Sequence, residues 1–221
     1  MKREELDSVL QVVENPIRRR IIKRLSQEPC YALQLSKELG LGQPLVAKHL
    51  GVMEEVGLVT SMMESSPSGP RRKRYSLARS LSITMDLAPN LFIERGVAFE
   101  SPQQTGRTSQ RTAQLRRRVS DAAEEEGDKR RLSRLSEVLD DVDGRINEIE
   151  GERMELLRIR NDVMREATQV AKRLEGFDKR RVFFHILDEH DREIESISES
   201  LNLRELAVKA ILEELERDYF G

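Results

Sequence analysis

The sequence of 221 residues contains no Trp, only one Cys and no long apolar run. A single Cys cannot form a disulfide within the chain, and scarce Cys is typical of the reducing cytoplasm. No stretch of about 18 apolar residues is present, so we expect no membrane span. The first residues, Met-Lys-Arg-Glu-Glu-Leu-Asp, lack the apolar core of an export signal. These absences predict a cytoplasmic protein.

Residue types that carry out catalysis or bind metals are also scarce. The three His residues are His49, His185 and His190. The last two are five positions apart, not the four that align two ligands on one helical face. The sequence has no phosphate-binding loop and no nucleophile elbow. We therefore expect no enzymatic activity, no cofactor and no metal site.

Charged residues are abundant, at 35% of the chain against 38% apolar residues. This composition is typical of a mainly helical chain with small domains and a coiled coil. The charge is unevenly distributed, because residues 1–80 carry 14 Lys and Arg against 9 Asp and Glu, and residues 81–221 carry 24 against 31. Attraction to phosphate makes the N-terminal part the candidate for nucleic-acid binding.

The pattern between residues 16 and 78 predicts a winged helix-turn-helix. One helix is expected over residues 32–39 and a second over 43–56, because a glycine, suited to the left-handed helix cap, follows each. Five apolar side chains fall at spacings that place them on the inward faces of two crossing helices. They are Leu35, Leu39, Val46, Leu50 and Met53.

The outward face of the second helix and the wing supply the candidate DNA-binding residues. The first turns of such a helix enter the major groove, where Gln pairs with adenine and Lys with guanine or phosphate. A short strand at 58–60, a turn at 65–70 and a basic return strand form the wing, which suits phosphates or a minor groove. The candidates are Gln43, Pro44, Ala47, Lys48 and His49 on the helix and Arg71, Arg72, Lys73 and Arg74 on the wing.

The run from Leu35 to Val59, LSKELGLGQPLVAKHLGVMEEVGLV, resembles the ArsR-type winged-helix repressors. More narrowly, the chain is similar to the archaeal heat-shock regulator and sulfur-response regulator. In those proteins a Thr-Pro-x-x-Phe-like segment follows the basic wing, and here it reads Leu-Ala-Pro-Asn-Leu-Phe over 87–92, with Ala in place of Thr. The resemblance covers roughly residues 5–97. It implies a regulator that represses transcription.

Two helices are expected before the helix-turn-helix. An amphipathic helix over 3–13 either packs on the domain or joins a dimer interface, as it often does in regulators of this class. Asn15 and Pro16 are typical of the start of the next helix. The cations of that helix form a solvated face or contact the DNA backbone. They include Arg18, Arg19, Lys23 and Arg24.

Cys30 lies just before the helix-turn-helix. The sulfur-response regulator has a Cys-x-x-Cys pair at this place, but here the first position is Gln27. A dithiol switch within one chain is therefore excluded. We expect Cys30 to be a structural thiol, and a one-thiol sensor or an intermolecular bridge stays open as an alternative.

Two segments connect this region to the rest of the chain. Residues 81–97 alternate between apolar and polar, so they predict a further strand beside the wing and end a DNA-binding domain at 1–97. Residues 98–128 are polar and turn-rich and carry opposed charge blocks, which predicts a partly flexible linker.

Residues 129–177 show a heptad pattern that predicts a coiled-coil helix. A bend near Gly151 is a further possibility, because Gly weakens a helix. We expect this helix to form a homodimer, with a helical hairpin within one chain as the alternative. The expected dimer contacts are Leu132, Leu135, Leu139, Val142, Ile146, Ile149, Leu156 and Val163, and Arg153 and Arg160 interrupt the seam.

Residues 178–221 repeat the apolar framework of the first helix-turn-helix after a shift of 162 positions. Leu35 corresponds to Ile197 and Val46 to Val208. The outward charges are mixed in sign, so we expect a contact or dimerisation module that takes a protein partner, not a second DNA reader.

Together these patterns predict a mainly α protein with a small β-wing. It would be a nucleoid-associated, sequence-specific regulator that binds double-stranded promoter DNA as a homodimer. The alternative is an architectural chromatin or adaptor protein of low sequence specificity, which a flat, salt-sensitive affinity would reveal.

Overall fold

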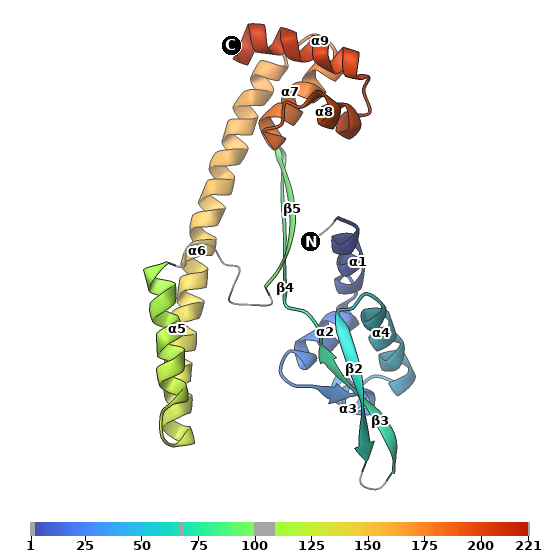
Figure 1. Cartoon of the computed structure of the whole chain (residues 1–221), viewed down its shortest axis with the longest axis vertical. Coiled ribbons are helices and arrows are strands. Elements are labelled where there is room, and N and C mark those ends of the chain that lie inside the picture. Colours follow the sequence, from blue (N-terminus) through green and yellow to red (C-terminus); the bar gives the residue numbers. More distant parts are fainter. Residues whose placement is uncertain (1–2, 67–68, 100–108, 221) are drawn as a thin grey trace. The chain divides into compact units, whose positions relative to one another are not determined.

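The computed structural model describes residues 3–66, 69–99 and 109–220. Its contacts divide the chain into two compact units, one of Met1–Leu87 with Phe92–Arg116 and one of Ala88–Leu91 with Arg117–Gly221. The expected class, mainly α with a small β-wing, is confirmed (Figure 1). The finer division at residues 97, 128 and 177 stays a prediction.

The first unit begins with four helices. They are α1 (Arg3–Val13), α2 (Pro16–Leu25), α3 (Ala32–Leu39) and α4 (Gln43–Glu55). Asn15 starts α2 as expected, because its side-chain oxygen accepts hydrogen bonds from the backbone N–H groups of Ile17 at 2.9 Å and Arg18 at 3.2 Å. Gly40 ends α3 with a φ of +66°, a conformation that glycine adopts without a Cβ clash.

The predicted inward face of α3 and α4 forms the centre of the first core. Leu35, Val46, Leu50 and Met53 are completely buried, and Leu39 is half-buried against them. Ile21 and Leu25 of α2 pack into the same cluster. This packing fixes which face of α4 points outward.

A three-stranded antiparallel sheet follows the helices. Its strands are β1 (Cys30–Tyr31), β2 (Val59–Ser66) and β3 (Gly69–Leu77), in the order β1-β3-β2. Val59 pairs with Leu77 and Glu64 with Arg72, so β2 and β3 form the expected wing hairpin.

The segment after the wing differs from the prediction of one strand beside it. The structure has two strands, β4 (Leu81–Ala88) and β5 (Leu91–Ala98), which form a separate two-stranded sheet. The alternating residues form strands as expected, but residues 89–90 reverse the chain as a turn, and Pro followed by Asn is typical of turns.

The segment predicted as a polar linker, 98–128, contains helix α5 (Gln110–Ala123). Arg118 of this helix forms an ion pair with Asp141, and Ala122 and Val138 are buried. The many Arg, Gln and Ala residues of α5 are good helix formers, so residues 110–123 form a helix although the segment is polar.

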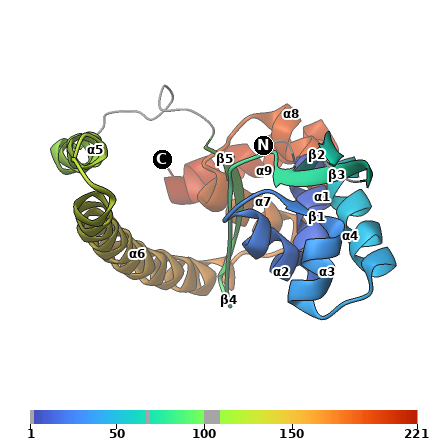
Figure 2. The same ribbon diagram turned by 90° about the horizontal axis from the view of Figure 1, so that it is seen from below.

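Helix α6 (Asp128–Ala171) has 44 residues and is continuous through Gly144 and Gly151 (Figures 1 and 2). It spans about 66 Å at the standard rise per residue. The helix is unbroken at Gly151, so the chain does not fold back there, and Figure 2 shows that α6 curves along its length. A Cβ at either glycine would meet no atom within 4 Å.

The C-terminal helices repeat the first helix-turn-helix, as predicted. They are α7 (Phe177–Glu189), α8 (Ile194–Leu201) and α9 (Glu205–Leu215), followed by a π-helical turn (Glu216–Phe220). Both ends of α8, and the start of α9, lie 162 positions after those of α3 and α4. Asn202 replaces Gly40 in the left-handed position, and Ser198 Oγ donates to the Leu203 carbonyl at 2.7 Å as Ser36 Oγ donates to that of Leu41 at 2.6 Å.

Replacing Gly151 with Ala should raise the free energy of unfolding of the second unit by about 1 kcal/mol, because the position is helical and open. Gly176→Ala is the control and should lower it, since Gly176 has a φ of +95°. Thermal unfolding followed by circular dichroism measures both. A loss of stability in Gly151→Ala would show that the glycine is needed for a bend.

Candidate nucleic-acid interface

The outward face of α4 carries four of the nine residues predicted to contact DNA. Gln43, Pro44, Ala47 and Lys48 are exposed, and the neighbouring Leu45 is 40% exposed. The first turn of α4 contains no acidic residue, and Gly42 caps it without a side-chain acceptor. The positive end of the helix dipole is therefore not neutralised by a carboxylate.

His49 is not on this open face, although the sequence pattern placed it there. Its ring is half-buried, and its Nε2 atom is enclosed without a hydrogen-bond partner among the described residues. Burial lowers the pKa of His49 below its ordinary value, and the nearby charges of Arg18 and Lys48 lower it further. These effects favour the neutral form of His49, and helical periodicity alone could not reveal them.

The four wing cations are not equivalent. Arg71 and Arg72 are exposed. Lys73 Nζ lies 3.7 Å from the Glu54 carboxylate of α4. The guanidinium of Arg74 donates to Glu64 Oε1 at 2.9 Å and to the Pro29 carbonyl at 3.4 Å. Arg74 thus binds the base of the wing to the helical domain.

Glu64 is the centre of a small network on the wing. The Tyr31 hydroxyl donates to Glu64 Oε2 at 2.5 Å, and Arg74 binds the other oxygen. The hydrogen bond from Tyr31, followed by that from Arg74, holds the pKa of Glu64 below its usual range. Sequence inspection missed this network because its members are 33 and 10 positions apart.

The cations of α2 mostly bind protein groups. Arg18 donates to the carbonyls of Val12 and Gln11, and Arg19 donates to those of Val13 and Glu14, at 2.5 to 2.6 Å. The last carbonyls of a helix lack partners within the helix and attract cations. Because only a short connection separates the end of α1 from Pro16, the sequence could have indicated that the first arginines of α2 reach these carbonyls.

Arg24 donates to Glu28 and Glu38, each at 2.5 Å. The cations Arg18, Arg19 and Arg24 therefore hold the helices together, and Lys23 remains on an exposed position.

The C-terminal helix-turn-helix presents different chemistry at the matching positions. Glu205, Leu206 and Lys209 of α9 correspond to Gln43, Pro44 and Ala47. Glu205 puts an acidic group in the first turn, and Leu206 is 82% exposed. Residues 177–220 carry 12 Asp and Glu against seven Lys and Arg. The net charge of this C-terminal segment is therefore negative.

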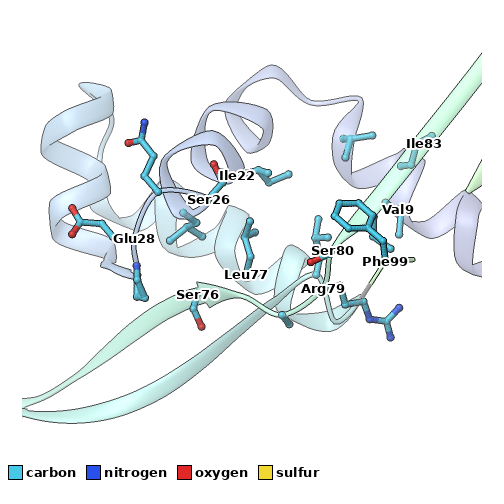
Figure 3. Close-up of a pocket in the computed structure, with 17 residues that line it drawn as sticks. Val9, Ile22, Ser26, Glu28, Ser76, Leu77, Arg79, Ser80, Ile83 and Phe99 are labelled. Carbon is cyan, nitrogen blue, oxygen red and sulfur yellow. The ribbon is translucent and has the colours of Figure 1, made fainter. Parts of the chain in front are cut away.

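The first unit also contains an open groove of about 1050 Å³ (Figure 3). Its lining is largely aliphatic, and it includes Val9, Ile22, Leu77 and Ile83 with Phe99 at the edge. Polar residues such as Ser26, Glu28 and Ser80 also line it. The groove contains no outward residue of α4, so it is separate from the candidate interface.

Over residues 3–66, 69–99 and 109–220, no group of three or more His, Cys, Asp or Glu side chains could hold a metal ion. In the same described ranges, no helix is both long and apolar enough to cross a membrane.

Comparison with known proteins identifies the helix-turn-helix region of the first unit. The profile of the family described as "Bacterial regulatory protein, arsR family" matches residues 15–61. An uncharacterized HTH-type transcriptional regulator of Methanocaldococcus jannaschii is 33% identical over 86 residues, which is 39% of this chain and 88% of that protein. The chain belongs to the ArsR family. Such regulators bind double-stranded DNA.

Two solved structures are also similar to this ArsR-family chain. One is an ArsR family transcriptional regulator, RHA00566, with 23% identity over 33% of this chain and 75% of that chain. The other is the cadmium sensor CMTR of Mycobacterium tuberculosis, with 34% identity over 34% of this chain and 72% of that chain. Both TM-scores are 0.29.

The lowered pKa of the half-buried His49 predicts a pH dependence of the first unit. Because its folded pKa is depressed, the unfolded chain binds the proton more tightly, and stability is lost as the pH falls below about 6.5. His49→Asn should reduce the difference between the urea midpoints at pH 7.5 and 5.5, followed through the NMR methyl signal of the buried Met53. The control His190→Asn, in the other unit, should leave the difference unchanged. If the difference between the two urea midpoints is the same in His49→Asn as in the unaltered protein, the enclosed position of His49 is contradicted.

Cys30 should be unreactive in the folded protein. It is 1% exposed, its Sγ lies 3.5 Å from the Glu28 carbonyl, and burial raises the pKa of its thiol. Since the thiolate is the nucleophile, alkylation by iodoacetamide at pH 7.5 should be slow in buffer and fast in urea. Mass spectrometry measures the two rates, and equal rates would restore the one-thiol sensor as an explanation.

Proposed function

We propose that this chain is a sequence-specific regulator that binds promoter DNA as a homodimer and represses by occupying the promoter. The observation that carries the proposal is the exposed, acid-free first part of α4, held by a completely buried inner face. A helix presented in this way can enter a major groove with its outer face against the bases. Family membership supports the DNA target.

Gln43 and Lys48 are the proposed base readers. The amide of Gln43 has the two groups that match an adenine edge, and Lys48 can donate to guanine or to phosphate. Pro44 and Ala47 are small, so the helix backbone between the two readers can approach the base edges. His49, enclosed beside Arg18, is proposed to position α4 and not to read a base.

Arg71 and Arg72 are the proposed phosphate contacts of the wing. They are exposed, whereas Arg74 is bound by Glu64 and by the Pro29 carbonyl. Lys73 can contribute as well, since its contact with Glu54 is loose at 3.7 Å and both side chains are exposed by a third or more. The wing would thus fix the register of the domain on DNA.

The proposed dimer forms through α6. Leu132, Leu139, Ile146, Ile149, Leu156 and Val163 are 47 to 66% exposed, although they are large and apolar. Leu135 and Val142 are half-buried in the single chain. Exposed apolar side chains at heptad spacing are typical of a helix that lacks its partner. Two copies would supply two reading helices for two half-sites.

The C-terminal helix-turn-helix is proposed to contact protein. It keeps the buried framework of the first one, but Glu205 occupies the position of Gln43 and its net charge is negative. An acidic surface with the exposed Leu206 suits a protein partner better than a phosphate backbone.

Capture of host genomic fragments by the purified protein near physiological salt, followed by sequencing, tests the proposal. We expect enrichment of an inverted repeat at promoters. Lys48→Ala should weaken binding and relax specificity at one position, by about 1–3 kcal/mol per base-reading contact. Arg72→Ala should weaken binding to all sequences similarly and lower the slope of log affinity against log salt by about 1.

Lys172→Ala is the matched control, because it removes one exposed Lys from the second unit. It should leave both the recovered sequences and the salt slope unchanged. Uniform, salt-sensitive recovery of the whole genome by the unaltered protein would overturn the specific regulator and favour the architectural alternative.

A further inference from the structure

We infer that the two copies of α6 pair in antiparallel orientation, with a two-fold axis between Asn147 and Glu148. This inference rests on the homodimer of the proposed function and adds its geometry. It follows from three observations on α6: where the exposed apolar positions lie, what the seam arginines would meet, and which charges flank the seam.

The six exposed apolar seam positions are symmetric about the point between Asn147 and Glu148. In the N-terminal half of α6 the first apolar position of each heptad is exposed. In the C-terminal half the second apolar position of each heptad is exposed. The symmetric pairs are Leu132 with Val163, Leu139 with Leu156, and Ile146 with Ile149. A two-fold interface needs this arrangement, because residue i of one copy contacts residue j of the other and j contacts i.

The rest of the seam is occupied by the chain itself or by Arg. In the N-terminal half, Leu135 and Val142 are half-buried near the region where α5 packs. In the C-terminal half, the corresponding edge carries Arg153 and Arg160, and Arg160 pairs with Asp188 of its own chain. Each half of α6 therefore presents one row of exposed apolar side chains. The row of one half contacts the row of the other half only when the two copies run in opposite directions.

The seam arginines also exclude a parallel, in-register pair. That pair would place Arg153 and Arg160 each against its own copy inside the seam, where two like charges repel. In the antiparallel pair Arg153 lies opposite Val142 of the partner subunit, and Arg160 lies opposite Leu135 of the partner subunit. The like-charge layers disappear.

On one side of the seam, the flanking charges are opposite in sign in the antiparallel register. Arg145 comes next to Glu152 of the partner subunit on one edge, and Arg131 comes next to Glu166 of the partner subunit. On the other side of the seam, Asp143 comes next to Glu150 of the partner subunit, which is a contact between like charges, and Arg153 of the partner subunit lies beside both carboxylates and offsets their repulsion. Both outer ion pairs occur twice in the symmetric dimer.

Disulfide cross-linking tests the orientation. In the antiparallel dimer, the double variant Leu139→Cys/Leu156→Cys should become almost entirely covalent dimer on mild oxidation, because the two positions face each other across the seam. Leu139→Cys alone and Leu156→Cys alone should stay uncross-linked. A mixture of the two single variants should cross-link up to about half, the share of mixed dimers. The unaltered chain, with only the buried Cys30, is the control.

Three results would overturn the inference: efficient cross-linking of Leu139→Cys with itself, a dimer by light scattering that cross-links at none of these positions, or a monomer at micromolar concentration. The genomic capture experiment decides the proposed function separately. An enriched promoter motif without cross-linking would contradict the antiparallel seam and support the specific regulator. Cross-linking with uniform genomic recovery would support the antiparallel seam and contradict the specific regulator.

Discussion

The packing of α3 against α4 is the constraint on which the proposed DNA surface depends. Leu35 on one helix and Val46, Leu50 and Met53 on the other are completely buried, so α4 has only one orientation that keeps them from water. Full burial of each such side chain contributes about 1.5–3 kcal/mol. The outer face of α4 is therefore presented on a rigid support, and its residues are free to serve recognition.

The same framework occurs twice in the chain, and charge separates the two copies. Both helix-turn-helix units have a residue in the left-handed conformation between their helices. In both, a serine hydroxyl of the first helix donates to the backbone carbonyl of the residue that follows this left-handed residue. At the start of the second helix, however, one unit has Gln43 and the other has Glu205. The buried positions specify the fold of each unit, whereas the exposed positions differ in charge, and we propose that this difference selects phosphate in one case and protein in the other.

Apolar periodicity was enough to predict the helices other than α5, the wing and the internal repeat, because burial of a face depends on spacing along the chain. It could not predict contacts between distant polar groups. Arg74 belongs to the wing by sequence but is held by Glu64, and His49 is enclosed next to Arg18. Helix α5 was missed because its stability comes partly from packing on α6, which composition does not encode.

Hydrogen exchange of the full chain, with and without an enriched promoter fragment, tests most directly which helix-turn-helix binds DNA. The account predicts slower exchange at residues 43–48 and at Arg71 and Arg72, with no change in α8 and α9. Slower exchange in α8 and α9 without any change in α4 would contradict it, because the acidic unit would then be the DNA reader.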